Sequence, residues 1–177
     1  MRLPLLILAL AFFAGACTDD SGRSEAPLET VEGLDIDRYL GKWYEIGRLP
    51  FRVQEGCVAT TATYSRIDAR TIRVLNECRH ERFDGELRSA SAKAWVADDD
   101  PARLKVQFFW PFRADYWVMA LDADYRWAMV GQPSRKYLWI LAREPDMSEG
   151  QYRSLLDLAA AQGYDVSRMQ RTPQPPD

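Results

Sequence analysis

The chain has 177 residues, of which 47% are hydrophobic and 28% are charged. Without a short N-terminal export segment, this length suits a single domain with a proper core, so a second domain is not expected. The 23 basic and 26 acidic residues are interspersed and give a formal net charge of -3, so the chain lacks the basic stripe that nucleic-acid binding requires.

The first residues have the features of an export signal. Arg2 precedes an apolar run, Leu3–Phe13, that is too short to span a bilayer permanently, so we assign residues 1–16 to a signal peptide. Cys17 directly follows the small residues Ala14–Ala16, which resembles the lipobox of bacterial lipoproteins, where the cysteine is lipidated. The alternative is a soluble periplasmic protein with a conventional cleavage site.

The segment that begins at Cys17 indicates how the protein is attached and to which membrane. It is rich in Asp, Ser, Glu, Gly and Pro and offers little apolar surface, so residues 17–32 are expected to form a flexible tether. Thr18 stands where an aspartate would resemble the signal that retains lipoproteins in the inner membrane. The sequence therefore predicts a protein attached to the outer membrane by its N-terminal lipid anchor and facing the periplasm.

The remaining domain, residues 33–177, is predicted to be a series of short strands separated by turn signals. A helical turn at 33–40 leads into the first strand. Apolar and polar residues alternate in Arg103–Phe108, as is typical of a strand with one wet face. Eight strands of an antiparallel meander are expected, at about 42–51, 58–67, 71–80, 86–97, 103–110, 116–122, 126–132 and 137–143.

One helix is expected after the strands. Ser148 is a suitable N-cap, Gln151 is its capping-box partner, and Gly163 ends a pattern of apolar residues at helical spacing. We predict a helix at about 148–162 whose apolar stripe packs on the outside of the sheet. Residues 164–169 are a candidate ninth strand, and residues 172–176 are expected to fray.

Cys57 and Cys78 are expected to form a disulfide. They flank a predicted hairpin, so pairing of its strands would bring them within the roughly 5.5 Å Cα separation that a disulfide needs, in a compartment where disulfides persist. Two free buried thiols are the alternative. A metal site would have a single histidine, His80, as a further ligand, and we expect no metal.

Three motifs resemble those of the lipocalins. Tyr39–Arg48 contains a segment similar to the Gly-x-Trp signature of the first strand, Leu121–Tyr125 resembles the second motif, and Trp139–Arg143 resembles the strand whose arginine stacks on that tryptophan. The likeness is greatest to bacterial outer-membrane lipoprotein lipocalins, which are also close to apolipoprotein D. It implies an all-β fold, an eight-stranded antiparallel up-and-down β-barrel with a C-terminal α-helix on the outside. Trp43 and Arg143 would close its floor by a cation–π contact.

Strand alternation above this floor gives candidate ligand contacts. If Trp43 points inward, Glu45 and Gly47 should also point inward, and on the strand that ends in the floor arginine so should Trp139 and Tyr137.

The resemblance adds further candidates. Tyr64, Asn76 and Trp139 match positions that line the pocket of apolipoprotein D. Strand position alone suggests six more pocket candidates, and for each of them core packing is the preferred interpretation: Phe108, Trp95, Trp110, Met119, Trp127 and Met129. An unpaired buried carboxylate is costly, so Glu45 is expected to pair with Arg48, with contact to a ligand head or a place near solvent as alternatives.

A cavity walled by aromatic and methionine side chains with a few polar groups suits a long apolar ligand with a polar head. The resemblance implies fatty acid or lysophospholipid, bound, stored or transported in the bacterial envelope, and no cofactor is expected. An enzyme is not expected, because His80 is the only imidazole and no catalytic triad is apparent. A scaffold protein that carries nothing is a further alternative, which an exposed apolar patch would favour, and a homodimer is left open.

Overall fold

The computed structural model describes residues 26–176. Its helices and strands are α1 (Ile36–Tyr39), β1 (Gly41–Arg48), η1 (Arg52–Gln54), β2 (Cys57–Arg66), β3 (Thr71–His80), β4 (Leu87–Ala97), β5 (Asp100–Phe109), β6 (Phe112–Leu121), β7 (Trp127–Gly131), β8 (Leu138–Ala142), α2 (Glu149–Ala161), η2 (Val166–Arg168) and β9 (Gln170–Arg171). The predicted signal peptide, the lipidation candidate Cys17 and the first part of the tether lie outside the described residues.

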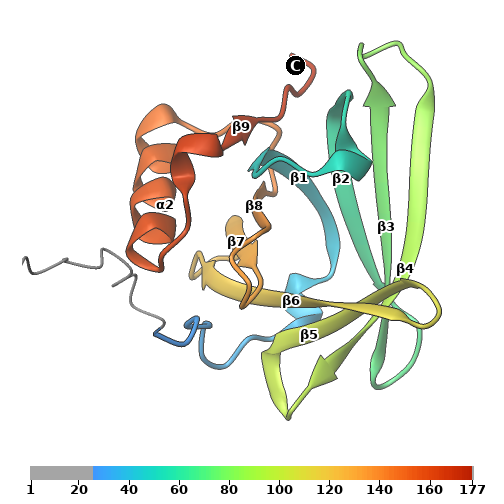
Figure 1. The fold of residues 1–177 in the computed structure, drawn as a ribbon. Helices are drawn as coiled ribbons and strands as arrows, with labels where there is room; N and C mark the ends of the chain where they lie inside the picture. The colour runs from blue at the N-terminus through green and yellow to red at the C-terminus, as the bar shows by residue number, and fades with distance from the viewer. Residues whose placement is uncertain (1–25, 177) are drawn as a thin grey trace, which may run out of the picture.

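The strands form a closed antiparallel barrel (Figure 1). Strands β2 to β8 are neighbours in chain order, β8 pairs with β1, and β1 pairs with β2 to complete the circle. The short β9 adds to β1 beyond this circle. Closure hydrogen-bonds each barrel strand on both sides, which removes the edges at which other chains could pair. The predicted eight-stranded barrel is confirmed.

The predicted strand boundaries differ most at the β4–β5–β6 meander. Strand β5 begins at Asp100 rather than at 103, and β6 begins at Phe112 rather than at 116. Asp98 and Asp99 adopt φ values of +54° and +57°, and this left-handed backbone reverses the chain in fewer residues than the predicted turn would. The hairpin between β5 and β6 is correspondingly longer, with Trp110 and Pro111 at its tip.

Helix α2 lies outside the barrel as predicted (Figure 1). The Ser148 side chain caps it by accepting a hydrogen bond from the Gln151 N–H, and Tyr152, Leu155 and Ala159 form its buried stripe. Within residues 26–176, no helix combines the length and apolar character needed to pass through a bilayer.

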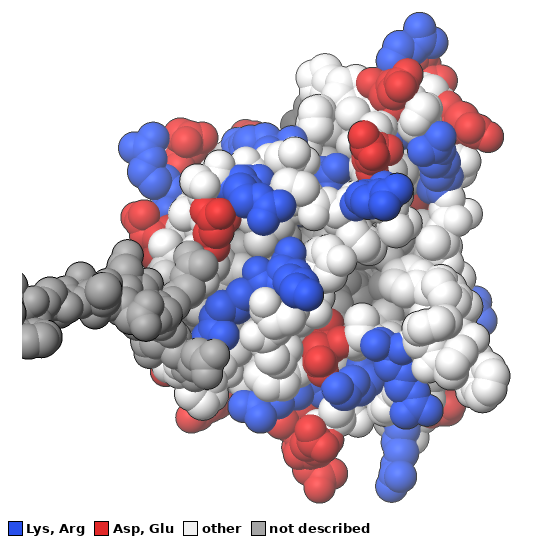
Figure 2. Space-filling model, in the orientation of Figure 1, with Lys and Arg blue, Asp and Glu red and all other residues white. Residues whose placement is uncertain are grey.

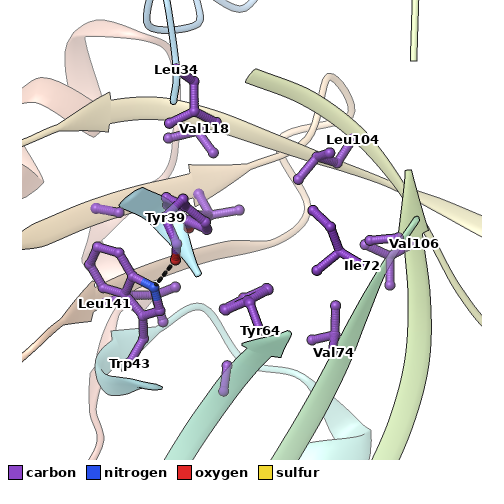
Figure 3. Packing of buried hydrophobic residues seen from close by; sticks show 14 of the residues in the cluster. Leu34, Tyr39, Trp43, Tyr64, Ile72, Val74, Leu104, Val106, Val118 and Leu141 are labelled. Carbon is purple, nitrogen blue, oxygen red and sulfur yellow. Dashed lines mark hydrogen bonds between the residues drawn. The ribbon is translucent and has the colours of Figure 1, made fainter. Parts of the chain in front are cut away.

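Buried apolar residues form two clusters, one on each side of the barrel wall. The inner cluster fills the closed half of the barrel and includes Leu34, Tyr39, Trp43, Tyr64, Ile72, Val74, Leu104, Val106, Val118 and Leu141 (Figure 3). The outer cluster lies between the wall and α2 and includes Ile46, Met119, Met129, Leu138, Ile140, Tyr152, Leu155 and Ala159. Strands β6, β7, β8 and β1 are therefore apolar on both faces.

A β-bulge in β1 changes which side chains face inward. The register of its pairing with β8 shifts between Glu45 and Gly47, so alternation holds from Trp43 to Glu45 and is then reversed. The prediction that Gly47 points into the barrel is wrong: a Cβ there would lie 2.6 Å from Tyr152 Oη on the outer helix. Arg48 takes the inward position in its place.

Both ends of the described chain pack against the barrel. Leu28 is only 3% exposed and belongs to the outer cluster, and the Val31 N–H donates to the Val118 carbonyl at 3.0 Å. Leu28 and Val31 of the expected tether therefore contact the barrel, and the flexibility expected for residues 17–32 stays a prediction.

The C-terminal residues also depart from the prediction. A 3-10 turn occupies 166–168 instead of a strand, and the ninth strand is Gln170–Arg171. Thr172 is buried and its N–H donates to the Ile46 carbonyl at 3.0 Å, while the Ala59 N–H donates to the Pro173 carbonyl at 2.8 Å. Residues 172–174 are thus packed against β1 and β2 and do not fray.

Candidate functional site

The floor of the barrel is closed by Trp43 and Arg143. The Arg143 guanidinium carbon lies 3.8 Å from the centre of the fully buried indole ring, which is the stacking predicted from the motifs. The indole N–H donates to the Tyr39 carbonyl at 2.8 Å (Figure 3). Arg143 also donates to the carbonyls of Arg38, Leu40 and Lys42 at 2.8–2.9 Å, so one side chain holds the α1–β1 connection across the closed end.

Three tyrosines form a hydrogen-bonded chain beside this floor. The hydroxyl of Tyr116 lies 2.8 Å from that of Tyr39 and 2.7 Å from that of Tyr64. Burial is the largest influence on all three phenols and raises the pKa of each above its ordinary value. They are therefore neutral donors and acceptors under physiological conditions.

The inner face of the barrel changes from buried to exposed between floor and mouth. Along β6, the inward residues are Val118, which is buried, Tyr116, which is half-buried, and Ala114, which is exposed. Across the barrel, Asn76 is half-buried and its cross-strand partner Ala90 is exposed. Inward side chains with solvent contact mark an open lumen in the half of the barrel nearer the mouth, and Figure 2 shows a hollow in this face of the molecule, with uncharged residues on its right and charged residues on its left and below it.

Aromatic side chains gather at the mouth. Tyr137 stacks on Trp139 with ring centres 6.0 Å apart, and Phe51 packs edge-on against both, at 5.0 Å from Tyr137 and 6.1 Å from Trp139. The Trp139 indole N–H donates to the Gln54 side-chain carbonyl at 3.0 Å. Gln54 lies in η1, within the connection between β1 and β2. This connection and β8 together form an apolar wall in which the indole N–H of Trp139 already has a hydrogen-bond acceptor.

Glu45 lies behind this wall in a polar network. Its carboxylate accepts from the Thr172 hydroxyl at 2.5 Å, from the Gln54 amide at 2.6 Å and from Arg48 at 3.4 Å. Burial raises the pKa of the Glu45 carboxyl, and these donors oppose that rise. The expected pairing with Arg48 is present. Because protein donors already occupy both carboxylate oxygens, Glu45 positions Gln54 and Trp139, and its direct contact with a ligand stays a prediction.

The other predicted contacts are placed as follows. Tyr64, Asn76, Trp139 and Tyr137 lie on the inner face or at its rim, and Phe108 lies at the mouth end of β5 with 45% of its surface exposed.

The further set predicted by strand position does not line the lumen. Met119 and Met129 are in the outer cluster, Trp127 packs against it, Trp95 shares the outer face with Lys105, and Trp110 is 82% exposed at the hairpin tip. Met119, Met129 and Trp127 thus have the core-packing role that was preferred for them, because the part of the barrel wall that α2 covers carries apolar side chains on both faces.

Several residues of the site were not predicted. Tyr116 could have been found by alternation, since it lies two positions from both Ala114 and Val118 on the same strand and therefore on the same face. Phe51, Gln54 and Thr172 lie in loops or terminal segments, where strand periodicity gives no signal.

Cys57, Cys78 and His80 lie together at the end of the β2–β3 hairpin. Cys57 and Cys78 form a disulfide with a Cα separation of 5.4 Å, as predicted, although the bulge after Val58 makes His80 the direct cross-strand partner of Cys57. Cys57 is therefore not a free thiol beside His80. Within residues 26–176, no three His, Cys, Asp or Glu side chains are grouped as metal ligands.

A closed eight-stranded barrel, a tryptophan–arginine floor, an outer C-terminal helix and an open apolar lumen together define a lipocalin. The model of the lipocalin-like domain matches residues 34–174 of the chain. The chain belongs to this family, whose members bind small hydrophobic ligands and are mostly binding and transport proteins.

Similar proteins come from bacteria, plants and animals. The chain is 39% identical to the outer membrane lipoprotein Blc of Escherichia coli (strain K12), over 98% of this chain and 97% of that protein. It is 43% identical to temperature-induced lipocalin-1 of Arabidopsis thaliana over 83% of each chain, and 31% identical to apolipoprotein D of Mus musculus over 96% and 95%. The structure of insecticyanin from the tobacco hornworm Manduca sexta has a TM-score of 0.64 at 20% identity, covers 83% of this chain and 84% of its own, and supports the fold.

Proposed function

We propose that this lipocalin binds a long-chain amphiphile, a fatty acid or a lysophospholipid, in its lumen and stores or transports it in the bacterial envelope. The observation that carries the proposal is the exposure of inward residues above a sealed floor, from half-buried Tyr116 to exposed Ala114. The apolar chain of the ligand would replace water against Phe108, Tyr137 and Trp139 and extend inward toward Tyr64, and burial of each methylene contributes about 0.8 kcal/mol. Asn76 supplies a polar group on the same face.

Location forms the second part of the proposal. The Cys17 lipobox resemblance and the name of the similar bacterial protein, outer membrane lipoprotein, support a lipid-anchored protein of the outer membrane that faces the periplasm. A Cys17→Ser variant should then leave the membrane fraction and appear in the soluble periplasmic fraction. Its persistence in the membrane fraction would show a different anchor.

Native mass spectrometry of protein purified from membranes tests the ligand directly, followed by removal of the bound lipid and titration with palmitate and with a lysophospholipid. Saturable binding should be weakened by Trp139→Ala and by Tyr64→Ala. Trp95→Ala is the matched control, because this tryptophan faces outward beneath Arg113, at 5.3 Å from its guanidinium carbon, and should leave binding unchanged. Equal ligand affinity of all three variants would show that the ligand binds outside the lumen.

One exposed apolar patch, the feature expected of the scaffold alternative, is also a surface through which two copies of the chain could associate. Phe109, Trp110 and Phe112 at the β5–β6 hairpin are 67–82% exposed, which is unusual for neighbouring aromatic residues on a monomer. We propose that this patch forms a homodimer contact. Sedimentation velocity over a range of concentrations should show a dimer that Trp110→Ser weakens, and a monomer at every concentration would exclude it.

A further inference from the structure

The three-tyrosine chain beside the floor has one hydroxyl proton more than its internal contacts use. Each phenol carries one O–H donor, so Tyr39, Tyr64 and Tyr116 bring three protons. The two oxygen–oxygen contacts, both made by Tyr116, consume one proton each. One hydroxyl must therefore donate to something outside the chain of three.

Burial decides which hydroxyl that is. Tyr39 and Tyr64 are 1% and 4% exposed, and within residues 26–176 their hydroxyls have no hydrogen-bond partner besides Tyr116. A spare proton on either would be a buried donor without an acceptor, which is unfavourable. Tyr116 is half-buried and belongs to the lumen side of the inner face. An arrangement in which Tyr39 and Tyr64 both donate to Tyr116 leaves the proton of Tyr116, the least buried of the three residues, free to point to the lumen.

The charges near the floor favour an acceptor with negative charge at that place. Arg143 interacts with the buried phenols of Tyr39 and Tyr64 and donates its hydrogen bonds to backbone carbonyls. Among the described residues it has no carboxylate within salt-bridge distance. By contrast, the buried carboxylate of Glu45 is already paired with Arg48. The floor therefore carries an uncompensated positive charge behind a neutral donor.

We propose that the Tyr116 hydroxyl anchors the carboxyl group of a long-chain fatty acid deep in the lumen, with the acyl chain running outward to the aromatic mouth. The inference rests on the proposed function and extends it by naming the orientation of the ligand and its polar anchor. The mouth is suited to the tail, since Phe51, Tyr137 and Trp139 present ring faces and the Trp139 N–H is satisfied by Gln54. Burial keeps the pKa of Tyr116 raised, so the donor is retained at alkaline pH as well.

The first test compares two phenylalanine variants of the full protein in palmitate titrations. Tyr116→Phe removes the free donor and should weaken palmitate binding about tenfold, the value of one hydrogen bond to a charged group. Tyr39→Phe is the matched control: it removes one hydroxyl of the same chain, but Tyr64 still donates to Tyr116 and the free proton survives, so affinity should change less than twofold. Thermal melts establish that both variants fold. Equal losses in the two variants would overturn the proposal.

The second test needs no variant. Palmitate labelled with 13C at the carboxyl carbon, and separately at the terminal methyl carbon, is bound to the wild-type protein and a water-soluble paramagnetic agent is added. The carboxyl signal should be protected and unresponsive to pH, while the methyl signal relaxes strongly. The reverse pattern would show the carboxyl group at the mouth and overturn this orientation while leaving ligand binding intact. Absence of saturable binding of both palmitate and lysophospholipid would instead refute the proposed function and this inference together.

Discussion

Replacement of Arg143 by alanine tests whether the barrel floor is held by one side chain. The guanidinium makes short hydrogen bonds to the carbonyls of Arg38, Leu40 and Lys42 and stacks on Trp43 at 3.8 Å. A net hydrogen bond contributes about 1 kcal/mol and a half-buried cation–π contact about 1 kcal/mol. Because Arg143 is half-buried, water can solvate part of the freed carbonyls, so we expect the free energy of unfolding to fall by about 3 kcal/mol.

Urea unfolding followed by tryptophan fluorescence and by circular dichroism measures this loss. Arg126→Ala is the control, because that arginine is 71% exposed in its side chain and pairs only with Asp122, so a change below about 1 kcal/mol is expected. Arg143→Lys should recover part of the loss, since an ammonium keeps the charge without the planar fork of donors. A loss below about 1 kcal/mol for Arg143→Ala would refute the view that this side chain holds the floor.

Three further outcomes are expected. Replacing both Cys57 and Cys78 by alanine opens a link that spans 21 residues and should lower the free energy of unfolding by about 3 kcal/mol in urea; no change in midpoint would contradict this. Burial raises the pKa of Glu45 above 4.5, so the folded state binds its proton more tightly and wild-type stability should decline, relative to Glu45→Gln, as pH rises from that value through the folded pKa; parallel pH profiles would exclude it. Gly47→Ala places a methyl group 2.6 Å from Tyr152 Oη and should cost about 1–3 kcal/mol, and Tyr152→Phe should reduce that cost in a double-mutant cycle, with strict additivity counting against the contact.

The barrel was predictable because its strands repeat with a period of two and end at strong turn residues. The same period placed Trp43 and Glu45 inward correctly, and the motifs placed Arg143 on the floor. It failed at Gly47, because a bulge inserts a residue that no alternation pattern encodes.

The lumen was harder to predict than the fold. Met119 and Met129 belong to strands that are apolar on both faces, so hydrophobicity alone cannot say which face encloses a ligand. Gln54 and Thr172 reach Glu45 from a loop and from the C-terminal segment, and such contacts depend on tertiary structure. The sequence therefore predicts the barrel well, but it predicts the polar contacts inside the barrel only in part.

The bond between Thr172 and Glu45 joins residues that are 127 positions apart. Synthesis proceeds from the N-terminus, so Glu45 is made long before Thr172. The hydrogen bond between them can form only after all eight barrel strands have been synthesised. Gln174 then donates to the carbonyls of Glu45 and Thr60 at 2.8 and 3.0 Å. Strands β1 and β2 are thus joined by residues that are synthesised after all eight barrel strands, so the polar network behind the mouth is completed only once the whole barrel has been made.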